Sequence, residues 1–387
     1  MLTTLKFRIY PSKKQESRLL HYFEVGRRFY NHSLEQRIKY YKETGKSLSN
    51  YDQNNDLTVL RSVSKVLGDV PCQVGRDSLR RLDKAFKNFF RRIKENKDKP
   101  GFPRFKGSGR WNSFSLLISG GGKRIICGSR IKVTGVSGLI RSRNVRPYKG
   151  VIKEQKIVCN AGKWSCHFTI DDGLPIPPLV PVKSAVGIDL GLKSFAVLST
   201  GEEIANPRFY RKKERKLKRI YRSISRKVKG SNNRRKNIKK LQCAYFNISN
   251  KRFNFTHHLS KRIVNEHQFI AVEKLTIPFM VRSRFAKSIL DAAWWQFIWQ
   301  VGYKAEKAGC QRVDVDPRYT SQDCSRCGER VQKDLSVRVH NCPKCGLQLD
   351  RDHNAALNVL QRAITAPGIG VSKAYGSATK PKRSRKS

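Results

Sequence analysis

The stretch AVGIDLGLKSFAVLS, residues 185–199, reads as two β-strands joined by a turn, because apolar runs flank its Gly-Leu-Lys segment. Further along the chain, the apolar run FIAVEKL (269–275) predicts a third strand. An aromatic-rich helix is expected around residues 292–308, and QRVDV (311–315) predicts a fourth strand. Strands that alternate with helices in this way imply an α/β domain.

The N-terminal part of the chain has a different texture. KFRIY (6–10) alternates like a short strand, and helices are expected from residue 11 to about 41 and from 77 to 94. From Pro100 onward, short β-like runs separated by Gly, Ser and Asn predict a small β-barrel or sheet, with a hairpin around residues 160–162. PIPPLVP (175–181) can continue neither a strand nor a helix, so it marks the expected domain boundary.

Positive charge dominates the composition, since 81 Lys and Arg against 29 Asp and Glu give a net charge of +52. Such self-repulsion implies a polyanionic partner. Nucleic acid fits better than a membrane surface, because the charge runs throughout the chain and lies beside aromatics and structured segments. The sequence has no apolar signal-peptide core and no run of roughly 18 uncharged apolar residues. It therefore predicts a cytoplasmic protein without membrane contact.

Two basic segments are candidates for contact with phosphates. On the expected helix at 77–94, basic side chains crowd the positions between the apolar ones, and few acids are present to pair with them. A solvated charged face is the alternative for this helix. The stretch 208–240 is still more basic and breaks at 230–233, which suggests a helical hairpin, with a separate helix near 253–265. The candidate residues on the two segments are Arg80, Lys84, Lys87, Arg211, Lys212, Arg234 and Arg235.

Four of the ten cysteines form two tight pairs. Each pair is a CxxC followed by Gly, and the members are Cys324, Cys327, Cys342 and Cys345. Two such turns supply the tetrahedral thiolate shell typical of zinc, and a four-thiolate shell leaves no open position for catalysis. The sequence therefore predicts one structural Zn²⁺, and the scattered remaining cysteines suit a reducing compartment.

Three acids lie at the ends of expected elements. Asp189 ends the apolar run AVGI, Glu273 ends FIAV, and Asp352 precedes an apolar-periodic helix, with Asp350 as its competitor. Each alone is more often a structural strand-end or cap residue. On one edge of a sheet, however, such acids can hold two Mg²⁺ ions roughly 4 Å apart, an arrangement that suits phosphodiester hydrolysis. Asp352 is preferred because it is the acid of an Asp-x-Asn-Ala pattern and because we place it closer to the helix start, with Asp350 as a neighbour that helps.

Several motifs in order carry a family resemblance. GIDLGLKSFAV, FIAVEKL, YTSQDCSRCG, NCPKCG and LDRDHNAALNVL resemble the RuvC-like signature of TnpB proteins, the transposon-encoded relatives of type V CRISPR effectors. FRIYPSKKQ, LRRLDKAFKNFFRRIK and GFPRFKG match as well, so the resemblance reaches from the N-terminus to about residue 363. It implies an α+β multidomain protein with an RNase H-like (RuvC) α/β nuclease domain.

The resemblance also implies a division of the chain and a set of roles. A β-barrel wedge domain would comprise 1–12 and 99–180, a helical recognition insertion 13–98, the nuclease domain 181–319 and 347–366, the zinc ribbon 320–346, and a disordered basic tail 367–387. Asp189, Glu273 and Asp352 match the metal-binding triad, and the four cysteines match the zinc-bearing insertion. Asn50, Tyr51, Asn54 and Arg76 become candidates for reading a short transposon-adjacent motif.

The implied function is RNA-guided DNA cleavage next to that motif. Its partners would be a guide RNA from the transposon end and a double-stranded DNA target, with the protein as a monomer near the nucleoid of a prokaryotic host. Three alternatives remain open at this point: a transposase that needs no RNA, a catalytically dead RNA-guided repressor, and a zinc-ribbon RNA-binding structural protein.

Overall fold

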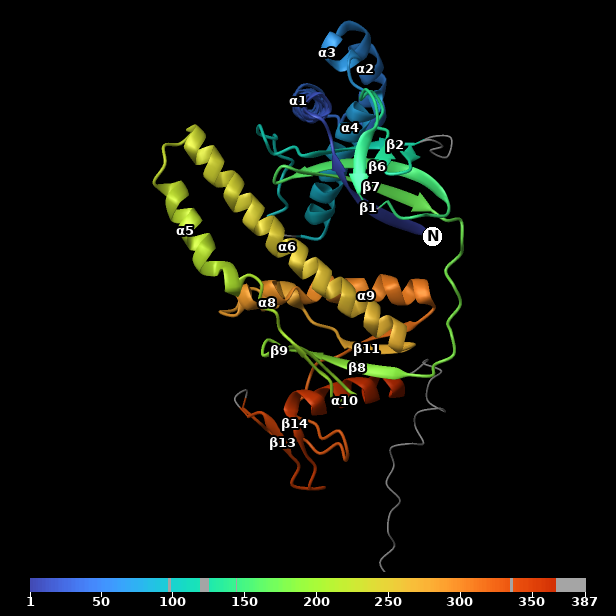
Figure 1. The fold of residues 1–387 in the computed structure, drawn as a ribbon, viewed down its shortest axis with the longest axis vertical. Coiled ribbons are helices and arrows are strands. Elements are labelled where there is room, and N and C mark those ends of the chain that lie inside the picture. Colours follow the sequence, from blue (N-terminus) through green and yellow to red (C-terminus); the bar gives the residue numbers. More distant parts are fainter. Residues whose placement is uncertain (97–98, 119–124, 144, 335–336, 367–387) are drawn as a thin grey trace, which may run out of the picture. The chain divides into compact units, whose positions relative to one another are not determined.

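The computed structural model describes residues 1–96, 99–118, 125–143, 145–334 and 337–366, and the chain divides into two compact units after Pro175 (Figure 1). The expected tail at 367–387 lies outside the described residues. The first unit contains α1 (Lys13–Thr44), α2 (Asn50–Val63), α3 (Lys65–Gly68) and α4 (Cys72–Lys94). A capping box between Ser12 and Gln15 starts α1, and Gly45 in the left-handed conformation ends it.

Helix α4 begins five residues earlier than the sequence predicts. Its N-cap is Pro71, which makes no side-chain cap hydrogen bond, so the sequence carries no cap signal for the start of this helix. Val74, Leu79 and Leu82 face the core of the unit, while the basic residues between them stay outside.

The first unit also contains a seven-stranded sheet in the order β2-β6-β7-β1-β5-β4-β3. The strands are β1 (Leu2–Tyr10), β2 (Ser113–Leu117), β3 (Ile126–Cys127), β4 (Arg130–Ile131), β5 (Ile140–Arg143), β6 (Val151–Asn160) and β7 (Lys163–Asp171). The hairpin expected around 160–162 is confirmed, since Ala161 and Gly162 take the positive φ angles of a tight turn between β6 and β7.

The expected barrel is instead an open half-barrel. Among the described residues, the outermost strands β2 and β3 each pair with one neighbour only. Strands β3 and β4 have two residues each, so they leave too short an edge to close the ring. The apolar core lies between the concave sheet and helices α1 and α4.

The second unit is built on a five-stranded sheet in the order β10-β9-β8-β11-β12. Its strands are β8 (Ala185–Leu190), β9 (Ser194–Leu198), β10 (Glu203–Ala205), β11 (Phe269–Glu273) and β12 (Gln311–Val315). Strand β11 runs parallel to both β8 and β12, whereas β9 and β10 are antiparallel additions. The expected α+β fold with an RNase H-like α/β domain is confirmed.

Helices cover both faces of this sheet (Figure 1). Helix α10 (Arg351–Thr365) packs on one face, and α6 (Asn232–Glu266) and α9 (Trp294–Ala308) pack on the other. Gly187 permits the close approach of α10, because a Cβ there would lie 2.2 Å from the Ala356 carbonyl oxygen. The remaining elements are η2 (Arg211–Lys213), α5 (Glu214–Ser225), α7 (Ile277–Met280), α8 (Ala286–Ala292), β13 (Val339–Asn341) and β14 (Gln348–Asp350).

The prediction of a separate helix near 253–265 was wrong. After the expected break at 230–233, α6 continues without interruption for 35 residues, from its N-cap Ser231 to Glu266. Only the C-terminal part of this helix is buried against the sheet, which is why its apolar pattern stood out alone. Over the part of the chain that the structure describes, no helix combines the length and the apolar character that a membrane span needs.

Candidate functional site

Three carboxylates gather at one edge of the second unit's sheet. Asp189 lies next to the end of β8, and Glu273 is the last residue of the parallel neighbour β11. Since Ile188 and Val272 are register partners, the two acids follow at adjacent positions. Asp352 joins them from the first turn of α10, which packs under β8. The carboxyl ends of parallel strands and a helix start therefore bring the three acids together.

The electrostatics reflect this crowding. Burial, followed by the negative charges of Glu273 and Asp352, raises the pKa of Asp189 well above its usual value. Burial also raises the pKa of Glu273 to about 7, although a hydrogen bond from Thr320 and the charge of Arg362 act in the opposite direction. Mutually repelling carboxylates in a partly buried site are a natural ligand set for a divalent cation, and oxygen ligands are those that Mg²⁺ prefers.

The competition between Asp350 and Asp352 takes a different form from the one expected. Asp350, not Asp352, stands at the helix start, where it is the N-cap of α10. Its Oδ1 accepts hydrogen bonds from the backbone N–H groups of Asp352, at 2.9 Å, and His353, at 3.1 Å. The expectation that Asp352 lies closer to the helix start was therefore wrong. The preference itself stays a prediction, supported by the larger effect of Asp352 on the pKa of Asp189.

Sequence reasoning missed the side chains that hold these acids. The Thr320 hydroxyl donates to Glu273 Oε1 at 2.9 Å, and Asp352 forms ion pairs with Arg351 at 2.9 Å and Arg338 at 3.7 Å. Thr320 lies within the YTSQDCSRCG motif, but nothing in that motif signals a contact between its hydroxyl and Glu273. The two arginines lie close to the second cysteine pair and Asp352, but nothing in their spacing signalled these contacts.

The four paired cysteines form a site that fits zinc. One ligand atom from each lies within 4.8 Å of all the others. Each pair closes in a tight turn, where Gly328 N–H donates to the Cys324 carbonyl and Gly346 N–H to the Cys342 carbonyl. Burial alone would raise the pKa of Cys342, but backbone hydrogen bonds from Cys345 and Lys344 outweigh it and lower the pKa to about 6. Burial raises the pKa of Cys324. A backbone hydrogen bond from Glu329 would lower the pKa of Cys327, but burial and hydrogen bonds with neighbouring thiols raise it to about 12. Four close and oriented thiols of this kind are the ligands of structural zinc, which holds them as thiolates.

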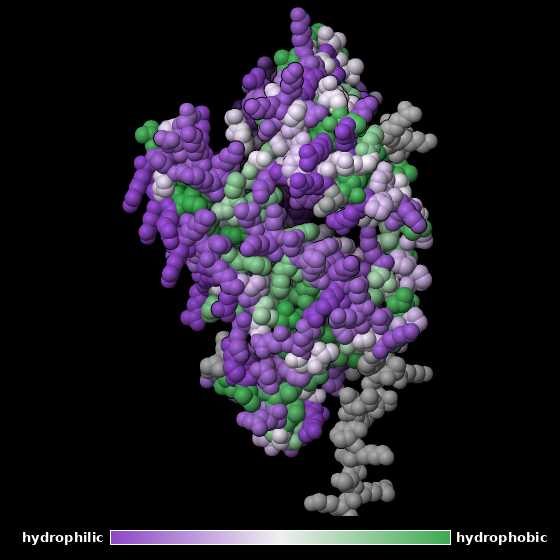
Figure 2. All heavy atoms as spheres, viewed as in Figure 1, coloured by the Kyte–Doolittle hydropathy of each residue, from purple (hydrophilic) through white to green (hydrophobic). Residues whose placement is uncertain are grey.

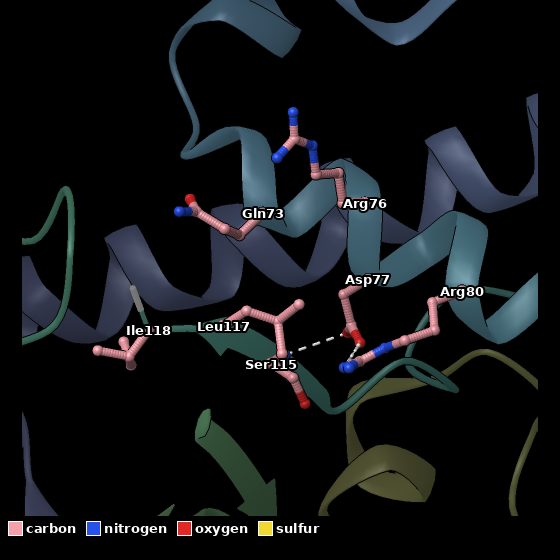
Figure 3. A pocket seen from close by; sticks show the side chains of 7 residues that line it. All are labelled: Gln73, Arg76, Asp77, Arg80, Ser115, Leu117 and Ile118. Carbon is pink, nitrogen blue, oxygen red and sulfur yellow. Dashed lines mark hydrogen bonds and ion pairs between the residues drawn. The ribbon is translucent and has the colours of Figure 1, made fainter. Parts of the chain in front are cut away.

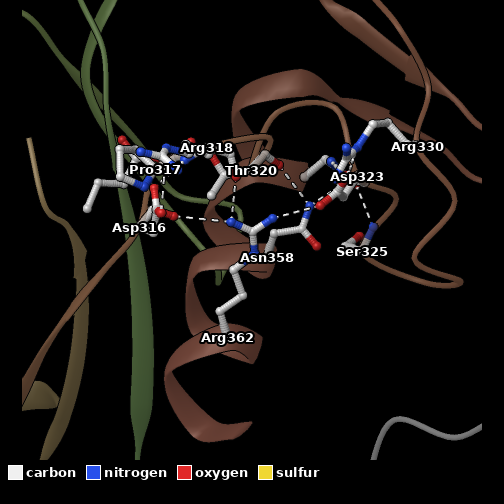
Figure 4. A network of polar contacts seen from close by, with 11 residues as sticks. Asp316, Pro317, Arg318, Thr320, Asp323, Ser325, Arg330, Asn358 and Arg362 are labelled. Atoms are coloured by element: carbon white, nitrogen blue, oxygen red, sulfur yellow. Dashed lines mark hydrogen bonds and ion pairs between the residues drawn. The ribbon is translucent and has the colours of Figure 1, made fainter. Parts of the chain in front are cut away.

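A polar network fastens the start of the zinc ribbon to α10 (Figure 4). Asn358 Nδ2 donates to the carbonyl oxygens of Thr320 at 2.8 Å and Asp323 at 2.6 Å. Arg362 donates to the Asp323 carboxylate at 2.7 Å and to the carbonyl oxygen of Arg318 at 2.6 Å. The loop between β12 and the first cysteine pair is thus held by α10 rather than by an apolar core.

The eleven candidate nucleic-acid contacts are divided between the two units. Those in the first unit are Asn50, Tyr51, Asn54, Arg76, Arg80, Lys84 and Lys87, and those in the second are Arg211, Lys212, Arg234 and Arg235. Asn50, Asn54 and Arg234 are half-buried, and the others are exposed.

Arg76 and Arg80 help to line a pocket of about 250 Å³ between α4 and β2 (Figure 3). At its base, Asp77 accepts from Ser115 N–H at 3.1 Å and pairs with Arg80 at 2.8 Å. Arg80 also pairs with Glu154 at 3.0 Å. Some of the positive charge on α4 is therefore neutralised by ion pairs within the protein, while Arg76 remains exposed at the rim.

In the second unit, hydrophilic side chains dominate the surface over α5 and the start of α6 (Figure 2). Lys212 and Arg235 are exposed there, whereas Arg211 pairs with Glu214 at 3.1 Å and donates to Ser288. The hairpin of α5 and α6 thus presents a basic surface that suits a polyanion.

Three family models match parts of this chain. Residues 1–46 match a "Helix-turn-helix domain", 165–284 a "Probable transposase" and 294–359 a "Cas12f1-like, TNB domain". The second and third matches contain all three acids and all four paired cysteines. The first covers β1 and the long helix α1, which form a strand and one helix here.

Named relatives extend over most of the chain. The "Putative RNA-guided DNA endonuclease" of Streptomyces pristinaespiralis is 31% identical over 94% of this chain and 90% of its own length. The "Putative RNA-guided DNA endonuclease InsQ" of Escherichia coli K12 is 30% identical over 93% of this chain and 92% of its own length. The "CRISPR-associated endodeoxyribonuclease Cas12f1" of Sulfoacidibacillus thermotolerans is 27% identical over 51% of this chain and 50% of its own length.

Proposed function

This chain belongs to the TnpB family of RNA-guided DNA endonucleases, and we propose that it cleaves DNA. Its active site would be formed by Asp189, Glu273 and Asp352. The observation that carries the proposal is the convergence of these carboxylates at one sheet edge, where burial, followed by the charges of Glu273 and Asp352, raises the pKa of Asp189. Such a cluster favours cation binding, because ionising its carboxylates without a cation costs free energy.

The three acids would hold two Mg²⁺ ions, which supply an activated water and stabilise the leaving 3′ oxygen when bound. The protein's own contribution is to fix the carboxylates on rigid elements. Asp189 and Glu273 are held by strand pairing, and Asp352 by the capped first turn of α10. The four cysteines would hold one structural Zn²⁺, which closes a ribbon that has little apolar core.

The partners follow from the family and from the charge. We propose that a guide RNA from the transposon end pairs with one strand of a double-stranded DNA target and delivers sequence specificity. The protein would read a short transposon-adjacent motif with the wedge domain (1–12 and 99–180) and the recognition insertion (13–98). Arg76 and the pocket beside α4 are candidates for that contact. Cytoplasmic localisation and the monomeric state stay predictions.

The test compares single-residue variants loaded with the copurifying RNA. Asp189→Ala should lower Mg²⁺-dependent cleavage of a guide-matched target by more than about 100-fold, because a group that stabilises transition-state charge is lost. RNA binding should stay intact. Glu306→Gln, which changes an exposed acid on α9, is the control and should cut at the normal rate. Full-rate cleavage by the Asp189 variant would overturn the assignment.

One match favours a second candidate, a transposase that acts without RNA. The family model over residues 165–284 is described as a probable transposase, and an acidic triad serves the same phosphoryl chemistry there. The two functions differ in their dependence on RNA. Treatment with RNase before target addition should abolish cleavage by an RNA-guided nuclease and leave a transposase active.

A further inference from the structure

Thr320 is a buried polar residue at the junction of the candidate nuclease site and the zinc ribbon. The residue is 4% exposed. The hydroxyl oxygen lies 2.9 Å from Glu273 Oε1 and 3.0 Å from the carbonyl oxygen of Pro317. A hydroxyl has one proton to donate, and an ionised carboxylate is a stronger acceptor than a carbonyl. When Glu273 is ionised, as a cation ligand must be, the hydroxyl proton is therefore directed at its carboxylate.

The backbone of Thr320 is fixed from the other side by α10. Asn358, which is 7% exposed, donates both to the Thr320 carbonyl and to the Asp323 carbonyl. Asn354, which is fully buried, also donates to the Asp323 carbonyl at 2.8 Å and accepts from Ser325 N–H at 2.9 Å. These hydrogen bonds hold residues 320–325 against α10. Cys324, the first cysteine of the ribbon, lies within this segment.

Two arginines hold the same segment through the side chain of Asp323. Arg362 of α10 and Arg330 of the ribbon each pair with the Asp323 carboxylate, at 2.7 Å and 2.9 Å. Figure 4 shows Thr320, Asp323 and Asn358 joined in one chain of contacts with these arginines. The ribbon is therefore connected to Glu273 through a short and fully polar path, with three residues between Thr320 and Cys324.

We propose that Thr320 is a positioning residue for Glu273 and that the zinc ribbon holds it in place, so that zinc binding strengthens cation binding at the acidic cluster. The inference rests on the proposed function, because it takes Glu273 as a ligand of the divalent cation. Side chains that orient a metal ligand commonly change metal affinity by roughly 10- to 100-fold when they are removed. Since the coupling is reciprocal, divalent cations at the cluster also make the ribbon harder to strip of zinc.

The first experiment compares Thr320→Val with Thr320→Ser in the full chain. Valine keeps the shape and removes the hydroxyl, whereas serine keeps the hydroxyl. Binding is followed by the rise in unfolding temperature during a Mn²⁺ titration, and zinc content is measured in parallel. The valine variant should need roughly tenfold more Mn²⁺ and still carry one zinc per chain, while the serine variant stays close to the wild type. An unchanged Mn²⁺ midpoint for the valine variant overturns the proposal.

A second measurement covers the case in which the valine variant does not fold. The wild-type protein is treated with a zinc-selective chelator, and its Mn²⁺ titration is repeated with and without zinc restored. Zinc removal should raise the Mn²⁺ midpoint, and zinc restoration should reverse the rise. A midpoint that is indifferent to zinc overturns the coupling.

The Glu273→Gln variant separates this proposal from the proposed function. If that variant still cuts DNA at full rate, the nuclease assignment itself fails. If it is inactive while the Thr320 variants and the zinc-depleted protein bind Mn²⁺ normally, only the positioning role fails.

Discussion

At the scale of single residues, ionising the acidic cluster is unfavourable, because its carboxylates are buried and repel one another. Glu273 is 6% exposed and its pKa is raised to about 7, mainly by burial. A carboxyl group whose pKa is raised in the folded protein favours folding while it is protonated, at low pH, and loses that contribution as the pH rises through the folded pKa. The cluster therefore destabilises the folded protein most at a pH where its carboxylates are ionised and no cation is bound.

This sign gives a prediction about pH. Between roughly pH 4.5 and pH 7, the metal-free protein should lose unfolding free energy relative to its Glu273→Gln variant, in which this group cannot ionise. Mn²⁺ affinity should change in the opposite sense and rise through about pH 7, since the ligand must be ionised. Denaturant unfolding of both proteins across this range is the measurement. Parallel pH profiles would contradict the raised pKa.

A second residue-scale prediction separates the neighbouring acids of α10. Asp350→Asn should keep the helix cap, because Asn caps as well as Asp, and should change stability by less than about 1 kcal/mol. It should also keep cleavage within a few-fold of wild type. Asp352→Asn should abolish cleavage. Cleavage rates and thermal unfolding of the two variants check this, and equal loss of activity would show that both acids serve the site.

The sequence could predict the acids and cysteines but not the side chains that hold them. Asp189 and Glu273 could be assigned because each follows an apolar run that ends at a sheet edge. Thr320 could not, because its role depends on a tertiary contact with a strand 47 residues away. The prediction that Asp352 rather than Asp350 lies closer to the helix start was wrong, since the sequence does not reveal whether a helix begins at residue 351 or 353.

At the scale of elements, the nuclease sheet and α10 meet at a point where only glycine fits. Gly187→Ala would place a methyl group 2.2 Å from the Ala356 carbonyl oxygen and 2.8 Å from Leu360. The substitution should destabilise the second unit by about 1–3 kcal/mol, as overpacking does, and move Asp352 with α10. Denaturant unfolding measures the loss. Gly107→Ala, where the added methyl meets nothing within 4 Å, is the matched control and should be neutral.

The elements themselves were predictable where an apolar pattern is continuous. Strands β8, β9 and β11 are entirely or almost entirely buried and stood out in the sequence. Helix α6 was only half predicted, because its basic N-terminal part lies against α5 rather than in the core and lacks a wide apolar stripe. Whether the first unit's sheet closes into a barrel or stays open could not be predicted either, because closure depends on strand pairing between distant segments.

At the scale of the whole molecule, a net charge of +52 makes RNA affinity a matter of counterion release. Affinity for the copurifying RNA should therefore fall steeply, by orders of magnitude, between about 50 and 200 mM salt. Exposed cations on the hairpin of α5 and α6 should account for part of this dependence. A filter-binding series at several salt concentrations measures the slope of log K against log salt.

The double variant Lys212→Ala, Arg235→Ala tests that share. If both side chains contact phosphates, the variant should flatten the slope by about 1.5, since each lost phosphate contact removes roughly 0.7 to 0.9. The loss should be uniform across guide sequences, because phosphate contacts carry no sequence information. Lys344→Ala is the control, since that ammonium already pairs with Glu329 at 3.0 Å on the zinc ribbon. An unchanged slope for the double variant would place the RNA elsewhere on the protein.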